Sequence, residues 1–232
     1  MLDFSGFEIS SFDCYGTLID WETGIFSALR PILSTHNKTI PDAVLLETFA
    51  ELEAAAETEY KPYREVLRSV VRGFGEKFEF SPSEQEQQSL ADSIRNWQPF
   101  ADTVHALRSL KQRCKLAIIS NIDDDLFATT APKLGVEFDF ITTAQQARCY
   151  KPNLEIFRLA QQRMGVVTGK WLHAGQSVYH DVVPAKSLGI ATVWVSRFSP
   201  RADAGATKAA SAKADAEVTN LQMLADLMSG AG

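Results

Sequence analysis

Short apolar segments rich in β-branched residues recur along the chain. They occupy residues 7–12, 115–120, 138–142, 170–174 and 190–196. Runs of this length and composition are typical of strands that are buried on both faces of a parallel sheet. Helical periodicity alternates with the later strands, at residues 101–112, 123–134, 152–165 and 179–188. This alternation predicts an α/β fold: a doubly wound parallel sheet with a Rossmann-like core.

The long stretch between the first two major strands shows helical patterns only. These patterns cover residues 23–35, 41–60, 62–78 and 81–97, and several of them begin at a Pro or at a Ser-Pro-Ser-Glu capping sequence. A crossover helix does not need so many residues. We therefore expect an all-helical subdomain at residues 21–97, inserted into a discontinuous core of residues 1–20 and 98–232.

The last part of the chain has a different composition. Residues 201–215 are rich in Ala and Lys, which favours a mobile surface segment without chemistry. Leucines at roughly helical spacing predict a last helix at residues 220–229.

Composition and charge narrow the function classes. The chain has 232 residues, of which 45% are hydrophobic and 22% charged, and a net charge of −6 with no basic stripe, which argues against nucleic acid as a partner. No apolar run is long enough to cross a membrane, and the first residues lack the features of a signal peptide. Three scattered cysteines fit reduced thiols. We expect a cytoplasmic protein.

Polar residues follow the ends of the predicted strands. The first strand leads into Asp13 and Thr17, the next into Ser120 and Asn121, and Lys151 precedes a helix. Residues 174–181 follow the strand at 170–174 and end in Asp181. Since the carboxyl ends of parallel strands share one edge of a sheet, we expect these groups to converge there.

These motifs, in this order around an insertion of this size, resemble the haloacid dehalogenase superfamily, and within it the type II 2-haloacid dehalogenases. The resemblance implies that the insertion is a cap over the active site. It implies an Asp13 nucleophile, which as a carboxylate needs no activating base, and Lys151 as its counter-ion. Thr17 would brace Asp13, and Asp181 would activate the water that hydrolyses the ester. Ser120 and Asn121 would orient a substrate carboxylate or receive the departing anion.

The motifs also bear on the choice between carbon and phosphorus as the reacting atom. A phosphatase of the superfamily would carry acids at positions 13, 15, 176 and 181 to hold magnesium, whereas this chain has Tyr15 and Gln176 at two of them. A single-charged 2-halocarboxylate needs no divalent cation. We therefore expect no cofactor and no metal site. Magnesium would enter only if the protein were a small-molecule phosphatase.

The expected substrate is a small carboxylic acid, and its binding residues follow from the same motifs. They are Cys14, Tyr15, Phe157, Gln176, Ser177, Tyr179 and His180. Phe157 stands where the 2-haloacid dehalogenases have a Tyr. His173, on a strand, is expected to be a core histidine with satisfied hydrogen bonds.

The first half of the insertion departs from the 2-haloacid dehalogenases in charge. The family holds the substrate carboxylate with an Arg from the early cap, but residues 42–60 contain no Arg or Lys and five Glu. We expect these glutamates to form a solvated helix face. In an alternative interpretation, Glu51 or Glu53 meets a cationic nitrogen of the substrate.

That alternative fits a second resemblance, carried by residues 12–24 and 177–181, to azetidine-2-carboxylate hydrolase, which opens a strained amino-acid ring. In that chemistry Tyr179 or His180 could protonate the leaving nitrogen. A non-catalytic binding protein is a further alternative, which the presence of nucleophile, lysine and distal acid disfavours. A homodimer is compatible with the resemblance.

Overall fold

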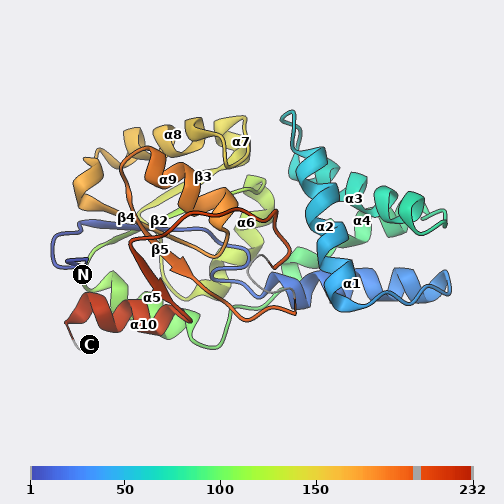
Figure 1. Ribbon diagram of the computed structural model, residues 1–232, viewed down its shortest axis with the longest axis horizontal. Coiled ribbons are helices and arrows are strands. Elements are labelled where there is room, and N and C mark those ends of the chain that lie inside the picture. The colour runs from blue at the N-terminus through green and yellow to red at the C-terminus, as the bar shows by residue number, and fades with distance from the viewer. Residues whose placement is uncertain (1, 201–204, 231–232) are drawn as a thin grey trace.

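The structure is a computed structural model that describes residues 2–200 and 205–230. At its centre lies a six-stranded sheet with the order β3-β2-β1-β4-β5-β6 (Figure 1). The strands are β1 (Ile9–Phe12), β2 (Lys115–Ser120), β3 (Phe140–Thr143), β4 (Trp171–Gly175), β5 (Ala191–Val195) and β6 (Ala216–Val218). Each neighbouring pair is parallel. The chain starts at the centre of the sheet and winds outward to each side in turn, which confirms the predicted doubly wound α/β fold.

Helices cover both faces of the sheet (Figure 1). One face carries α7 (Ala144–Ala147), α8 (Leu154–Met164) and α9 (Val183–Ser187), and the other carries α5 (Thr103–Lys111) and α10 (Leu221–Ser229). Successive side chains of a strand point to opposite faces. Leu116 and Ile118 of β2 accordingly belong to the larger apolar cluster, and Ala117 and Ile119 to the smaller one. Because both faces are covered, every residue of β1 and β4 is buried, including Ser10, Ser11 and His173.

Four helices between β1 and β2 form the part of the molecule that we call the helical insertion. They are α1 (Trp21–Thr35), α2 (Asp42–Ala56), α3 (Tyr63–Lys77) and α4 (Glu84–Ser93), followed by a 3₁₀ turn at Ile94–Asn96. They gather beyond one end of the sheet (Figure 1). Phe12 of β1 and Trp21, Phe49 and Phe74 of the insertion belong to one apolar cluster, so the insertion packs onto the sheet. The domain boundaries at residues 20 and 97 stay a prediction.

Several helices are shorter than the sequence pattern predicts. The helix expected at 41–60 ends at Ala56. The one expected at 123–134 divides into α6 (Asp124–Thr130) and a 3₁₀ turn at Ala131–Leu134, which contains Pro132 and therefore lacks one backbone donor. The helix expected at 179–188 begins as a π-helical turn, Val178–Val182. Apolar periodicity does not distinguish these tighter and wider turns from an α-helix.

The surface segment predicted at residues 201–215 is present only in part, and residues 201–204 lie outside the described residues. Residues 208–213 are exposed, as expected. Ala206 and Thr207 are buried, which the sequence did not predict. Directly after this segment, β6 extends the sheet beyond β5. Asp215 accepts hydrogen bonds from the backbone N–H and the hydroxyl of Thr192 in β5. A three-residue strand is too short to show a period, so the sequence pattern contains no signal for it.

None of the helices in the described ranges combines the length and the apolar surface that crossing a membrane requires.

Candidate active site

Asp13 lies directly after β1, beside the point where the strand order reverses. Its backbone N–H donates to Ala174 O of β4 at 3.0 Å, and the residue is only 8% exposed. Gly16, with φ of +92°, makes the turn that follows. A Cβ at this position would lie 2.8 Å from Nε1 of Trp21, so the turn requires glycine for space as well as for conformation. The turn holds a buried carboxylate at the edge of the sheet.

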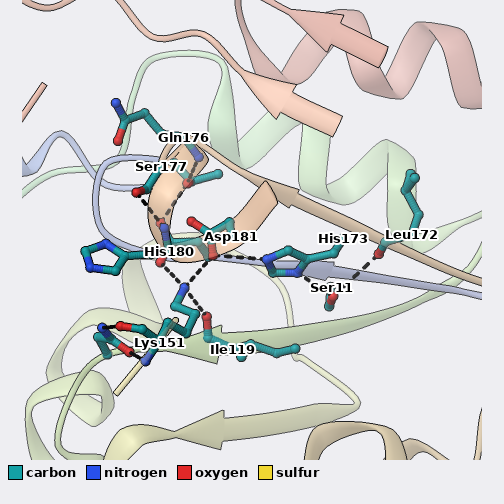
Figure 2. Close-up of polar contacts among 12 residues, drawn as sticks. Ser11, Ile119, Lys151, Leu172, His173, Gln176, Ser177, His180 and Asp181 are labelled. Carbon is teal, nitrogen blue, oxygen red and sulfur yellow. Dashed lines mark hydrogen bonds and ion pairs between the residues drawn. The ribbon is translucent and has the colours of Figure 1, made fainter. Parts of the chain in front are cut away.

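Lys151 joins the two acids of the site. Its Nζ donates to Asp13 Oδ1 at 2.9 Å. It also donates to Asp181 Oδ1 at 2.7 Å and to the carbonyl of Ile119 at 2.9 Å (Figure 2). These three acceptors use all three hydrogens of an ammonium group. Burial opposes the charge, but the two carboxylates outweigh it and raise the pKa of Lys151. The lysine is therefore a fixed cation between two acids.

The two carboxyl groups differ in their environment. Burial raises the pKa of Asp13, against the opposing effects of Lys151 and Thr17. Burial also tends to raise the pKa of Asp181. Lys151 and His173 outweigh this effect and lower the pKa of Asp181 to about 2. Asp181 therefore stays ionised over the physiological range. Among the residues that the structure describes, no group of three or more His, Cys, Asp or Glu side chains could hold a metal ion.

His173 is buried with both ring nitrogens bonded, as the sequence predicted, but one partner is the distal acid. Nε2 lies 3.0 Å from Asp181 Oδ1, and Nδ1 lies 2.8 Å from Oγ of Ser11 (Figure 2). Ser11 Oγ accepts a hydrogen bond from Trp171 Nε1 at 2.7 Å. When the Ser11 hydroxyl donates to Nδ1, the neutral ring carries its proton on Nε2 and donates it to Asp181. Sequence reasoning missed the contact with Asp181, because it depends on how the turn at Val178–Val182 places this residue against β4.

The side chains of Thr17 and Asn121 form hydrogen bonds that position other residues of the site. Thr17 Oγ1 donates to Asp13 Oδ2 at 2.7 Å and accepts from the backbone N–H of Gln176 at 2.9 Å. The Asn121 side chain accepts from the backbone N–H of Lys151 at 2.7 Å and donates to its carbonyl at 3.1 Å. Asn121 therefore fixes the lysine loop with its side-chain carbonyl and one of its two amide hydrogens. Ser120 Oγ, in contrast, is buried and has no hydrogen-bond partner in the described part of the chain.

A π-helical turn carries the last motif. The backbone N–H of His180 donates to Ser177 Oγ at 3.0 Å, and Val182 N–H reaches back five residues to Ser177 O. Asp181 packs so closely on β4 that a Cβ at Gly175 would lie 2.5 Å from its Cγ. Such wide turns are frequent at functional sites. Burial lowers the pKa of His180 to about 4, so its ring is neutral near pH 7 and does not serve there as an imidazolium acid.

A pocket opens onto these residues. Its walls are formed by Asp13, Tyr15, Trp21, Glu53, Tyr63, Ser120, Asn121, Lys151, Ser177, His180, Asp181 and Thr207. Trp21, Glu53 and Tyr63 come from the helical insertion, which therefore supplies one wall. Thr207 comes from the tail, which the sequence prediction did not place at the site.

Four residues that the sequence assigned to substrate binding do not line this pocket. Cys14 and Phe157 are fully buried in apolar clusters, and Phe157 packs against Trp171 and His173. Gln176 lines a neighbouring hollow instead, and its carbonyl accepts from Trp194 Nε1. Tyr179 packs edge-on against His180, beneath the Lys208 ammonium. Cys14 lies between Asp13 and Tyr15, which both line the pocket, and its own side chain points the opposite way into the apolar cluster.

Glu53 is the main departure from the sequence prediction. It is 4% exposed, and its Oε1 accepts a hydrogen bond from the Tyr63 hydroxyl at 2.5 Å. Burial, with Asp13 adding to it, raises the pKa of Glu53 to about 7 against the opposing hydrogen bond from Tyr63. The expected solvated face holds for Glu51, which is exposed and pairs with Lys77, but is wrong for Glu53.

The doubly wound sheet, the helical insertion and the buried acid–lysine–acid site together are typical of one family of hydrolases. A family model for haloacid dehalogenase-like hydrolases matches residues 11–189, and the chain belongs to this family. Haloacetate dehalogenase H-2 of Moraxella sp. is 25% identical over 202 residues, which cover 82% of this chain and 86% of that one. The L-2-haloacid dehalogenase of Xanthobacter autotrophicus, with chloropropionic acid covalently bound, has a TM-score of 0.80 at 19% identity and covers 97% of this chain and 100% of its own. The glyceraldehyde 3-phosphate phosphatase of Methanocaldococcus jannaschii is 34% identical, over 41% of this chain and 43% of its own.

Proposed function

We propose that the protein hydrolyses a small 2-substituted carboxylic acid by displacing a leaving group from C2 through an ester of Asp13, with (S)-2-haloacids as the first substrates to test. One observation carries this proposal: Lys151 bridges Asp13 and Asp181 in a single buried site. The bridge supplies a nucleophile, its counter-ion and a second acid for the hydrolysis step. The similarity to haloacetate dehalogenase H-2 over most of both chains supports it.

In the first step, a carboxylate oxygen of Asp13 attacks C2, and the bond from C2 to the leaving group breaks with its electron pair on the leaving group. Lys151 and Thr17 hold the carboxylate in place for the attack. The buried Ser120 hydroxyl is available to donate to the substrate carboxylate.

In the second step, water attacks Cγ of the Asp13 ester and releases a 2-hydroxy acid. Asp181 Oδ1 is bound by Lys151 and His173, whereas Oδ2 is buried without a hydrogen-bond partner in the described residues. Oδ2 is therefore the atom that can orient the water and accept its proton.

The donor set does not fit the magnesium ion that a phosphatase of this family would need. Tyr15 stands at a position that would have to be an acid, and its hydroxyl hydrogen-bonds to Thr130 at 2.8 Å. Gln176 stands at another such position and lines a different hollow. Carboxylates are the preferred protein ligands of this cation. We therefore route no step through a metal.

A second candidate reaction is ring opening of azetidine-2-carboxylate, in which the leaving group is the ring nitrogen. The observation that favours it is the charge of α2, which contains no Arg or Lys and contributes Glu53 to the pocket. Both candidates share attack by Asp13 and an ester intermediate.

One set of assays tests the reaction and separates the candidates. The purified protein is incubated with (S)-2-chloropropionate, azetidine-2-carboxylate and a generic phosphate ester, each with and without chelator. Chelator-insensitive turnover of either carboxylic acid is expected, with none for Asp13→Asn. A single turnover in heavy-oxygen water should then label the peptide that contains Asp13. Turnover of the phosphate ester alone, abolished by chelator, would contradict the proposal.

A further inference from the structure

Glu53 of the helical insertion faces the nucleophile across the pocket. Glu53 and Asp13 line the same cavity, and the charge of Asp13 is felt at Glu53. The Tyr63 hydroxyl binds Oε1, and no hydrogen bond within the described residues reaches Oε2. One carboxyl oxygen is thus fixed by the protein and the other is available to a ligand.

The charges around the pocket favour a ligand with a positive group. Three of the described lining residues, Asp13, Asp181 and Glu53, are acids. Lys151 is the single cation among the described lining residues, and its three hydrogens already bind Asp13, Asp181 and Ile119. A simple carboxylate anion would therefore enter a pocket whose negative charge is not balanced.

A donor for a carboxylate comes from a different element of the pocket lining. Ser120 lies at the end of β2, whereas Glu53 belongs to the insertion. The Ser120 hydroxyl is buried and has no partner among the described residues. The cavity therefore offers a free hydroxyl donor on the sheet side and a carboxylate on the insertion side, which suits a molecule with charges of both signs.

We propose that Glu53 is a specificity-determining residue that binds a positively charged nitrogen, so that the preferred substrate is a small zwitterionic amino acid rather than a simple anion. This inference rests on the proposed function, since it takes the Asp13 pocket as the substrate site. Tyr63 orients the carboxylate for this contact.

The protonation state of the Glu53 carboxyl group provides a test that needs no mutation. The groups that face it are Tyr63 from α3, Glu57 from the end of α2, and Asp13, Lys151, Tyr150 and His180 from the sheet side. His180 stays neutral above about pH 4. Because the pKa of Glu53 is about 7, binding of a cationic nitrogen should weaken as the pH falls through that value.

The test compares two non-reacting ligands of nearly equal shape, 2-aminopropionate and 2-hydroxypropionate of the same hand, by calorimetric titration. The wild-type protein at about pH 8 should bind the amino acid at least about tenfold more tightly, as a charge-assisted contact implies. Glu53→Gln should bring the ratio of the two dissociation constants close to one. Glu51→Gln, on the same helix but exposed and paired with Lys77, is the matched control and should leave the ratio unchanged.

Preference of the wild type for the hydroxy acid, or an unchanged ratio in Glu53→Gln, would overturn the inference. If Glu53→Gln does not fold, the wild-type ratio measured from about pH 8 to about pH 5.5 decides, since a constant ratio contradicts a role for Glu53. Heavy-oxygen labelling of Asp13 is measured separately. Labelling without ligand selectivity refutes only this inference, whereas selectivity without labelling refutes only the proposed reaction.

Discussion

Asp123 accepts a hydrogen bond from the backbone N–H of Tyr63 at 2.9 Å, and through its other oxygen one from Arg64 N–H at 3.1 Å. The acid follows β2, whereas its partners are the first residues of α3 in the helical insertion. Its sequence position predicts a cap for the helix that starts immediately after it, but no side-chain cap bond to α6 forms. Asp123 instead places a carboxylate at the positive end of α3, across the boundary between sheet and insertion.

Asp123→Ala should loosen the insertion. The substitution leaves two N–H groups at the start of α3 unsatisfied, which costs about 1–2 kcal/mol in the free energy of unfolding. Because Tyr63 also holds Glu53, we expect weaker substrate binding as well. Denaturant unfolding and steady-state kinetics measure the two effects. Asp125→Ala, which removes an exposed ion pair with Arg64, is the control and should change stability little. Equal losses in both variants would contradict this role of Asp123.

His173→Phe should slow hydrolysis of the ester more than its formation. Asp181 loses a buried donor that lowers its pKa, so the pKa should rise and the water should be held less well. Loss of a hydrogen bond to a charged group of this kind costs about 1.5–3 kcal/mol, or roughly 10- to 100-fold in kcat.

Rapid quenching followed by mass spectrometry should show the Asp13 ester accumulating in His173→Phe, and the acidic limb of the kcat profile should move to higher pH. His173→Gln, which keeps a donor near the position of Nε2, should restore part of the rate. A variant that is merely less stable, with an unchanged pH profile and no trapped ester, would show that His173 has only a packing role.

The sheet was predictable because its strands are apolar on both faces, and a run such as Lys115–Ser120 has few other interpretations. The four helices of the insertion were also predictable, through proline and capping signals. β6 was not, because three residues do not show a period and its partners come from β5. The π turn at Val178–Val182 was missed for a related reason, since its wider winding depends on contacts of Ser177 and Asp181 that a linear pattern does not encode.

The sequence motifs named the residues that meet at the carboxyl edge, since the topology brings strand ends together. The motifs do not include Glu53, Tyr63 or Thr207, which reach the pocket from the insertion and the tail. Glu53 was named only in the alternative interpretation, as a partner for a cationic nitrogen. A glutamate on a helix rich in glutamates gives no sign of burial. The signal was the absence of Arg and Lys from α2, which already suggested an unusual charge at this wall.

Glu53 should make the protein less stable as the pH rises. Its pKa is about 7 in the folded state, against an ordinary value of 4.5 for this side chain, so between these values the folded state holds a proton that the unfolded chain has lost. Stability therefore falls with rising pH in that window, by at most about 3 kcal/mol.

Urea unfolding of wild type and Glu53→Gln from about pH 4.5 to 7.5 measures the difference between their free energies of unfolding. His180, whose lowered pKa acts in the opposite direction, contributes equally to both proteins. A constant difference across the window would show that Glu53 does not titrate there.

Gly175→Ala should inactivate the protein while leaving the fold intact. A Cβ at this position would lie 2.5 Å from Asp181 Cγ and 2.6 Å from its Oδ2, so Asp181 must move away from Lys151 and His173. A displacement of about 1 Å in a catalytic group can cost about 100-fold in rate.

Gly169→Ala is the matched control, because a Cβ there meets no atom within 4 Å. Circular dichroism, thermal unfolding and turnover of the best carboxylic acid substrate should show two folded proteins of which only the control is active. Full activity in Gly175→Ala would mean that the position of Asp181 relative to Lys151 does not limit the reaction, and would remove the distal acid from the proposed mechanism.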